Sequence, residues 1–217
     1  MRRSTPEPTD PGLVGSPHPA ASRAMTRYVA LLRGVNVGGV TVRSADLAAL
    51  FTELGFGAVK TVLASGNVLF DTDAADAASG SAGSGSAGSG SARAAASVKQ
   101  TIELGLRDRF GYDVWIVLVE HAALAAIVDA FPYDEVDGMQ PYVVFGSDAA
   151  VLRDVARFAA ELDPATDGER AEPGDGVLYW EVPKGHSVDT ALAKHLARPA
   201  LKSSTTTRNL RTLRKLL

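Results

Sequence analysis

The chain has 217 residues, of which 46% are hydrophobic and 22% charged, with no Cys and a formal net charge of −3. This composition is typical of a globular protein of one or two small domains. A chain without Cys cannot form disulfides, thiolate metal sites, iron–sulfur clusters or thiol nucleophiles. No segment approaches the ~20 consecutive apolar residues of a bilayer span, so we expect a cytoplasmic protein without a membrane partner.

Residues 1–24 form an N-terminal arm that we expect to be disordered. The arm contains five prolines and few apolar residues, so it is suited neither to a helix nor to a buried strand. It also lacks the unbroken apolar segment of a secretory signal. Met25 directly precedes the first strand-like run, so Met1 and Met25 are both candidates for the true start. An intact mass of the native protein distinguishes them.

The region 25–120 is predicted to be one subdomain with the order strand, helix, strand, strand, helix, strand. The apolar runs and the helical stripes place these elements at 28–32, 44–54, 59–63, 68–70, 98–110 and 114–119. This order defines the split βαβ, or ferredoxin-like, unit.

A Gly/Ser/Ala run interrupts this first subdomain. Residues 79–92 are fourteen positions occupied only by Gly, Ser and Ala, the composition of a flexible linker. We therefore predict a flexible insert over 78–96. It falls between the third strand and the second helix, inside the unit, where a longer surface loop costs little entropy.

The region 121–217 partly repeats the first pattern. We expect a linking helix, then strand, helix, strand, strand and helix, at 124–131, 142–145, 151–162, 169–172, 177–182 and 188–196. No fourth strand is recognised, and 205–207 are interpreted as N-cap residues of a last helix over 210–217. The predicted fold is therefore α+β, with two ferredoxin-like subdomains, the second incomplete, and a basic C-terminal helix.

Charge is unevenly placed along the chain. No acidic residue follows Asp189, and the last 28 residues carry seven Lys or Arg, which leaves −10 for the rest of the chain. One interpretation is a solvated helix whose cations lie beside carboxylates of the body. The other is a patch that binds phosphate or a polyanion.

Three segments resemble the bacterial family called domain of unknown function 1697. They are Leu31-Leu-Arg-Gly-Val-Asn-Val-Gly-Gly39, Ser65-Gly-Asn-Val-Leu-Phe70 and Thr206-Thr-Arg-Asn209. The resemblance spans Met25 to the end of the chain, apart from the Gly/Ser/Ala run. It implies an α+β protein of two ferredoxin-like subdomains and implies no activity. The chain departs from the family pattern in having Val62 and Ala64 before the Ser-Gly-Asn turn, where members have Tyr and often Gln.

A further departure is Leu210, which follows the Arg-Asn pair where members usually have Trp. The absence of that Trp weakens any idea that an aromatic ring there stacks on a ligand.

The glycine-rich turn after the first strand is the leading candidate site. Its glycines let backbone amides turn toward an anion, a helix N-terminus near Ser44 adds partial positive charge, and Arg33 supplies a countercharge. The turn lacks the Lys-Ser/Thr of a P-loop and the G-x-G-x-x-G spacing of a dinucleotide site. Alternatively, Gly34 and Gly38 only satisfy positive φ angles in a tight connection.

We predict a cleft for a small anionic ligand, bearing phosphate or carboxylate, in which Arg33 and Arg208 hold the anion from two sides. The predicted ligand-binding residues are Arg33, Gly34, Asn36, Gly38, Gly39, Ser65, Asn67, Arg208 and Asn209. Ser65 and Asn67 are alternatively hairpin residues, and Arg208 a helix-start residue. The set includes no general base, although Asp46 is one residue that could supply it. Binding is therefore favoured over catalysis, and no cofactor is assigned.

Metal and nucleophile chemistry have little support. The four histidines, His18, His121, His186 and His195, have no ligand spacing, so no metal site is predicted. The residue types of a catalytic triad occur in His186, Ser187 and Asp189. Neighbouring residues of one turn rarely have the geometry of a triad, however, and Ser187 also suits an N-cap.

Two alternative functions remain open. The first is nucleic-acid binding through the basic C-terminal segment, although the aromatic signature of an RNA-recognition motif is absent. The second is a protein–protein interaction module that uses its sheet edges, with an oligomeric state that the sequence leaves open.

Overall fold

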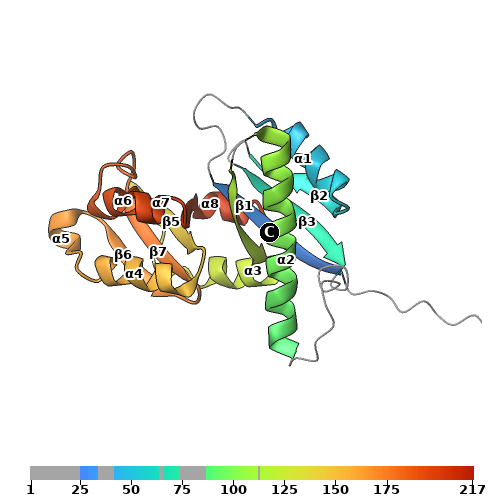
Figure 1. The fold of residues 1–217 in the computed structure, drawn as a ribbon. Helices are drawn as coiled ribbons and strands as arrows, with labels where there is room; N and C mark the ends of the chain where they lie inside the picture. The colour runs from blue at the N-terminus through green and yellow to red at the C-terminus, as the bar shows by residue number, and fades with distance from the viewer. Residues whose placement is uncertain (1–24, 34–41, 64–65, 74–86, 112) are drawn as a thin grey trace, which may run out of the picture.

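The computed structural model describes residues 25–33, 42–63, 66–73, 87–111 and 113–217. In these residues the chain forms two four-stranded antiparallel sheets, each with helices on its outer face and with two helices between them (Figure 1). The predicted arm at 1–24 lies outside the described residues. None of the described helices is long and apolar enough to cross a membrane.

The first unit contains four strands and two helices in the predicted order. These are β1 (Met25–Arg33), α1 (Ser44–Glu53), β2 (Gly57–Thr61), β3 (Asn67–Asp73), α2 (Ala87–Phe110) and β4 (Trp115–Glu120). The strand order β2-β3-β1-β4 is that of a complete split βαβ unit, with β1 and β3 in the centre. The α+β prediction is confirmed for this half.

The second unit has the same topology and is complete. Its elements are β5 (Met139–Gly146), α4 (Ala149–Ala159), α5 (Pro164–Asp167), β6 (Arg170–Gly174), β7 (Val177–Pro183), α6 (Ala191–Leu196), α7 (Pro199–Lys202) and β8 (Thr205–Asn209). The strand order is β6-β7-β5-β8. The prediction of an incomplete second subdomain was wrong in this detail, because the threonine run interpreted as a helix cap is the fourth strand, paired along β5.

The central strand β1 is buried on both faces, which explains its unbroken apolar sequence. Because side chains alternate along a strand, Tyr28, Ala30 and Leu32 pack beneath α1 and α2. Val29 and Leu31 point the other way, into a core that the two units share.

This shared core lies between the two sheets and includes α3 (His121–Asp129) and α8 (Leu210–Arg214). Leu210, which stands where family members usually have Trp, is fully buried there. The position is therefore part of the core and offers no surface for stacking on a ligand. A third core, around Val144, Leu178 and Trp180, lies between the second sheet and α4, α6 and α7.

Helix α2 begins earlier than the sequence predicts. It starts at Ala87, within the Gly/Ser/Ala run, so residues 87–96 of the predicted flexible insert are helical. The buried stripe of Val98, Ile102 and Leu106 anchors the helix, and the alanines at 94–96 extend it at little cost because Ala has the highest helix propensity. Residues 74–86 lie outside the described residues.

Candidate functional site

Arg33 lies where the two units meet. It is the last residue of β1, pairs with Trp115 of β4, and is half-buried. Strand β1 also contacts β8 of the second unit. The Arg33 Nη1 donates a long hydrogen bond of 3.5 Å to Thr205 Oγ1, and the Thr205 hydroxyl in turn donates to the carbonyl of Leu201 at 2.9 Å. The guanidinium of the first unit therefore reaches the edge strand of the second.

Arg208 approaches the same junction from β8. Its Nε donates to Asn67 Oδ1 at 2.8 Å, and its Nη2 donates to the backbone carbonyl of Leu32. Its Nη1 donates to Thr206 Oγ1 at 2.7 Å and to the Thr207 carbonyl at 3.0 Å. Arg208 therefore joins β8 to β1 and β3, and most of its donors are directed to the protein itself.

The two guanidinium groups influence each other. Burial, and then the positive charge of Arg33, lower the pKa of Arg208 to about 10. Burial also lowers the pKa of Arg33. Among the described residues, Arg33 makes no ion pair with a carboxylate. This end of the junction is therefore strongly cationic.

A cavity of about 320 Å³ opens beside Arg33 on the outer face of the second sheet, and we call it the Arg33 cavity. Its polar lining consists of the Arg33 guanidinium and the side chains of Ser187, Thr205 and Thr207. Thr205 and Thr207 share this lining because alternate residues of β8 face the same way. The Thr207 hydroxyl and the guanidinium are groups that donate to phosphate or carboxylate oxygens, whereas the Thr205 hydroxyl already donates its proton to the Leu201 carbonyl.

The rest of the lining of the Arg33 cavity is largely apolar. It includes Val188 from the connection before α6, and Leu196 and Ala197 from the end of α6. The rings of Tyr142 and Trp180 also line it, with centroids 5.2 Å apart, although Trp180 is only 2% exposed. No carboxylate and no imidazole is among the described residues that line this cavity.

Two other cavities are less suited to an anion. One of about 30 Å³ lies on the other side of Arg33, near Lys99 and Trp115, and this volume is comparable to that of one water molecule. Another of about 390 Å³ lies between α3 and the β6–β7 turn, where alanines and prolines form the walls. Its charged lining is Glu172 and Asp175, which would repel an anion.

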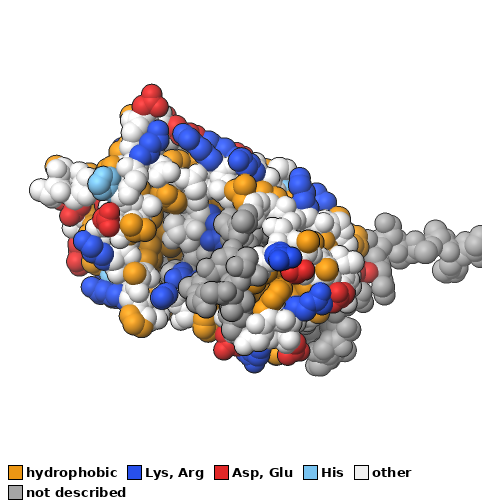
Figure 2. Space-filling model, turned by 90° about the horizontal axis from the view of Figure 1, so that it is seen from above, with side chains coloured by type: hydrophobic (Ala, Val, Ile, Leu, Met, Phe, Trp, Pro, Cys, Tyr) orange, Lys and Arg blue, Asp and Glu red, His pale blue; other side chains and the backbone are white. Residues whose placement is uncertain are grey.

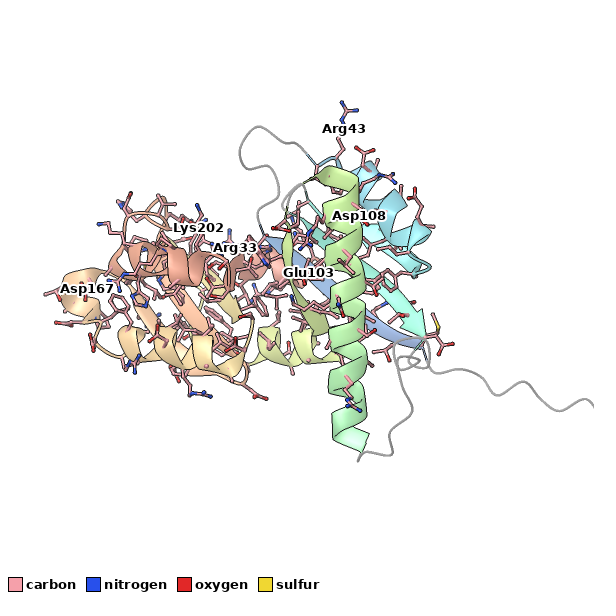
Figure 3. All side chains as sticks on the ribbon, viewed as in Figure 1. Arg33, Arg43, Glu103, Asp108, Asp167 and Lys202 are labelled. Atoms are coloured by element: carbon pink, nitrogen blue, oxygen red, sulfur yellow. The ribbon has the colours of Figure 1, made fainter. Side chains whose placement is uncertain are left out.

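Cations also gather outside the Arg33 cavity. Figure 2 shows one face of the molecule on which Lys and Arg side chains form a row along one margin. Lys194 of α6, Arg198 at the N-cap position of α7 and Lys202 of α7 are exposed, and the structure gives none of them an ion pair among the described residues. Figure 3 shows Lys202 on the same upper side of the molecule as Arg33.

The other predicted site residues have different places. Asn67 is fully buried; its Nδ2 donates to the Val62 carbonyl at 2.9 Å and its Oδ1 accepts from Arg208. Asn209 caps α8, accepting from the Arg211 amide at 2.9 Å. Both amides therefore hold the fold around the junction. Gly34, Asn36, Gly38, Gly39 and Ser65 lie outside the described residues.

Sequence reasoning did not select Thr205, Thr207, Tyr142 or Ser187 as cavity residues. Ser187 was considered as a triad member or an N-cap, whereas the N-cap residue of α6 is Thr190. An available signal was strand alternation, since interpreting 205–209 as a strand places Thr205 and Thr207 on one face. The described residues contain no cluster of three or more His, Asp or Glu placed to hold a metal ion.

The fold and the site define a protein of two ferredoxin-like units with a cationic cavity at their junction. The family model described as a protein of unknown function, DUF1697, matches residues 25–87 and 82–179. The chain therefore belongs to the DUF1697 family. No curated protein matches the chain.

A solved structure with the same fold is that of a conserved bacterial protein from Streptococcus pneumoniae. The two chains share 24% sequence identity with a TM-score of 0.64, and the match covers 89% of this chain and 97% of the other. At this identity the similarity establishes the two-unit fold.

Proposed function

We propose that the protein binds a small anionic ligand, bearing a phosphate or carboxylate group, in the Arg33 cavity. The observation that supports this most is the half-buried Arg33 guanidinium, which lines a cavity without a lining carboxylate and lies near a second guanidinium. The absence of carboxylates and imidazoles among the described lining residues favours binding over acid–base catalysis.

The electrostatics of the junction supply the driving force. Two like charges in a partly buried place repel more strongly than they do in water. Arg208 cannot relieve the repulsion by moving, because its hydrogen bonds to Asn67, Leu32 and Thr206 fix its position. An anion bound at Arg33 neutralises the excess charge and takes the donors that face the cavity.

A thermal-shift titration with inorganic phosphate tests this proposal. A ligand at 100 times its Kd stabilises the folded state by about 2.7 kcal/mol, which raises the Tm measurably. We expect stabilisation of the native sequence and its loss in Arg33→Gln. Arg27→Gln is the matched control, because Arg27 lies in the same strand and pairs with Asp71 at the surface.

The proposal requires the two variants to behave differently. If Arg33→Gln is stabilised by phosphate as strongly as Arg27→Gln is, the anion binds elsewhere and the Arg33 cavity is not the site. If the native protein is not stabilised by phosphate or by carboxylates at any concentration, anion binding itself is refuted.

Nucleic-acid binding is a second candidate, supported by the three exposed cations of α6 and α7. Of the four remaining C-terminal cations, Arg211 and Arg214 pair with Glu135, Arg208 is directed into the junction, and Lys215 is exposed after α8, away from α6 and α7 in the sequence. Lys194, Arg198 and Lys202 are thus the part of the basic segment that suits a polyanion.

Retention on heparin or single-stranded DNA tests this second candidate. Deleting the C-terminal segment is not a usable test, because it removes β8 and the buried Leu210 and Leu213. The triple change of Lys194, Arg198 and Lys202 to Gln is expected to abolish salt-dependent retention. An equal charge change at Arg27, Arg107 and Arg157, each in a surface ion pair, is the control. Equal retention of both triple variants would refute a role for α6 and α7.

A further inference from the structure

The lining of the Arg33 cavity has a polar part and an apolar part, and this composition limits the kind of anion that fits. The polar part includes Arg33 and Thr207, and the apolar part includes Val188, Leu196 and Ala197. Inorganic phosphate needs only the polar part. The volume of about 320 Å³ lies in the range of pockets that enclose small organic molecules.

Val188 indicates that the apolar part of the lining extends to the surface. Its side chain is 74% exposed, more than any other large apolar side chain that the structure describes as exposed. It lies in the connection between β7 and α6, at the Arg33 cavity, instead of folding into the core beneath. An apolar group on a bound ligand would cover it and gain the free energy of removing that surface from water.

The charge of the lining adds a second restriction. The described lining residues include a cation and no anion. A ligand that also carries an ammonium group would lose hydration without gaining a carboxylate partner, and it would be repelled by Arg33. The cavity therefore disfavours zwitterions such as amino acids or phosphoethanolamine.

From these observations we infer that the ligand is an organic anion with an apolar body, such as an aryl or alkyl ester of phosphate or the corresponding carboxylate, with its anionic group on Arg33 and its apolar body against Val188, Leu196 and Ala197. This inference rests on the proposed anion binding. It adds the chemical class of the ligand and names Val188 as a residue that determines specificity.

Calorimetric titration of the full chain with phenyl phosphate, inorganic phosphate and phosphoethanolamine tests the inference. We expect phenyl phosphate to bind at least about tenfold more tightly than either of the other two, since burying part of a phenyl ring contributes that much. Arg33→Gln removes binding of all three. Val188→Ser removes most of the advantage of phenyl phosphate and leaves inorganic phosphate unchanged.

Val136→Ser is the matched control, because Val136 is 55% exposed and does not line the Arg33 cavity. It is expected to leave all three affinities unchanged. Equal affinities for phenyl phosphate and inorganic phosphate, both lost in Arg33→Gln, would overturn the inference and leave anion binding standing. Binding of phosphoethanolamine as tight as that of phenyl phosphate would also overturn it. If none of the three binds the native protein, the proposed function fails as well.

Discussion

The two units share one topology but differ where their first strand leads into their first helix. In the second unit only Ser147 and Asp148 connect β5 to α4. Asp148 caps that helix, with its Oδ1 accepting from the amides of Ala150 at 2.8 Å and Val151 at 3.0 Å. The hydrogen bonds from Val151 and then Ser147 hold the pKa of Asp148 below its usual value.

The corresponding connection of the first unit is the ten-residue segment 34–43. Its last residue, Arg43, occupies the cap position of α1 and makes no side-chain cap hydrogen bond. The strand ends differ too. A Cβ on Gly146, which ends β5, would lie 2.7 Å from Leu152 Cγ, so α4 packs directly on that strand end. Arg33, which ends β1, lines a cavity instead. The same topology therefore packs a helix against the strand end in one unit and leaves the strand-end residue lining a cavity in the other.

Arg208 holds the two units together, and replacing it is expected to have the largest effect. In Arg208→Met the acceptors on Asn67, Thr206 and Leu32 lose their donor, and each unsatisfied buried group costs roughly 1–3 kcal/mol. We expect a loss of about 3 kcal/mol or more in the free energy of unfolding, measured by urea denaturation. Arg208→Lys restores the charge but not the planar set of donors, so recovery should be partial. A loss below about 1 kcal/mol would contradict this role.

Alanine at the two strand ends is expected to lower stability by different amounts. Gly146→Ala places a Cβ against Leu152 and the Asp148 carbonyl, so we expect a loss of roughly 1–3 kcal/mol from overpacking. Arg33→Ala removes a half-buried cation that repels Arg208, so its cost should be under about 1 kcal/mol. Denaturant unfolding of both variants measures the contrast. Equal losses would show that the strand end of β1 is as tightly packed as that of β5.

The first helix of the second unit has a side-chain cap and that of the first unit has none, so single substitutions can remove the one and supply the other. Asp148→Ala should cost about 1 kcal/mol, because two α4 amides lose their acceptor. Arg43 has φ −74° and ψ 142°, which suits an N-cap residue, so Arg43→Ser should stabilise the protein by roughly 0.5–1 kcal/mol. Thermal unfolding checks both changes. An Arg43→Ser variant without any gain would show that the α1 amides are already satisfied.

His195 makes the second unit sensitive to mild acid. It is buried, stacks on Phe158 with centroids 4.0 Å apart, and neither ring nitrogen has a hydrogen-bond partner among the described residues. Burial, and then Arg198, lower its pKa from the ordinary 6.5. The unfolded state therefore binds a proton more readily, so the stability present above pH 6.5 decreases as the pH falls below that value.

We expect the Tm of the native protein to decrease between pH 7 and pH 5.5, and that of His195→Leu to decrease less. Asp148 responds in a more acidic range, because its pKa is lowered from 3.8, so it does not mask the effect. Identical pH profiles for the two proteins would rule out His195 as the cause.

The sequence predicted those elements whose own side chains bury apolar surface. The run at β1 and the stripe at α4, with Val155 buried against the second sheet, are of this kind. Strand β8 was missed because it contains no apolar residue. Thr206 is buried and Arg208 faces the junction, and both are stabilised by partners distant in sequence, which no local pattern records.

The candidate site was predictable to a similar extent. A cation at a strand end beside a glycine-rich segment selected Arg33, and the C-terminal match selected Arg208. The structure brings these two together, but it directs Arg208 toward Asn67 and Leu32. The cavity lining of Ser187, Thr205 and Thr207 depends on the approach of β8 and α6 to β1. That approach is a property of the packed core, so spacing along the chain does not reveal it.

The position of β1 in two cores has a consequence for synthesis. Val29, Leu31 and Leu69 of the first sheet face a core that is completed by Leu210 and Leu213 of α8, at the other end of the chain. A nascent chain that has finished the first sheet therefore carries an incompletely covered apolar face until α8 has been synthesised. Such a face is prone to association with other chains and is a typical target of chaperones. Prematurely terminated chains should consequently aggregate instead of persisting as a folded half-protein.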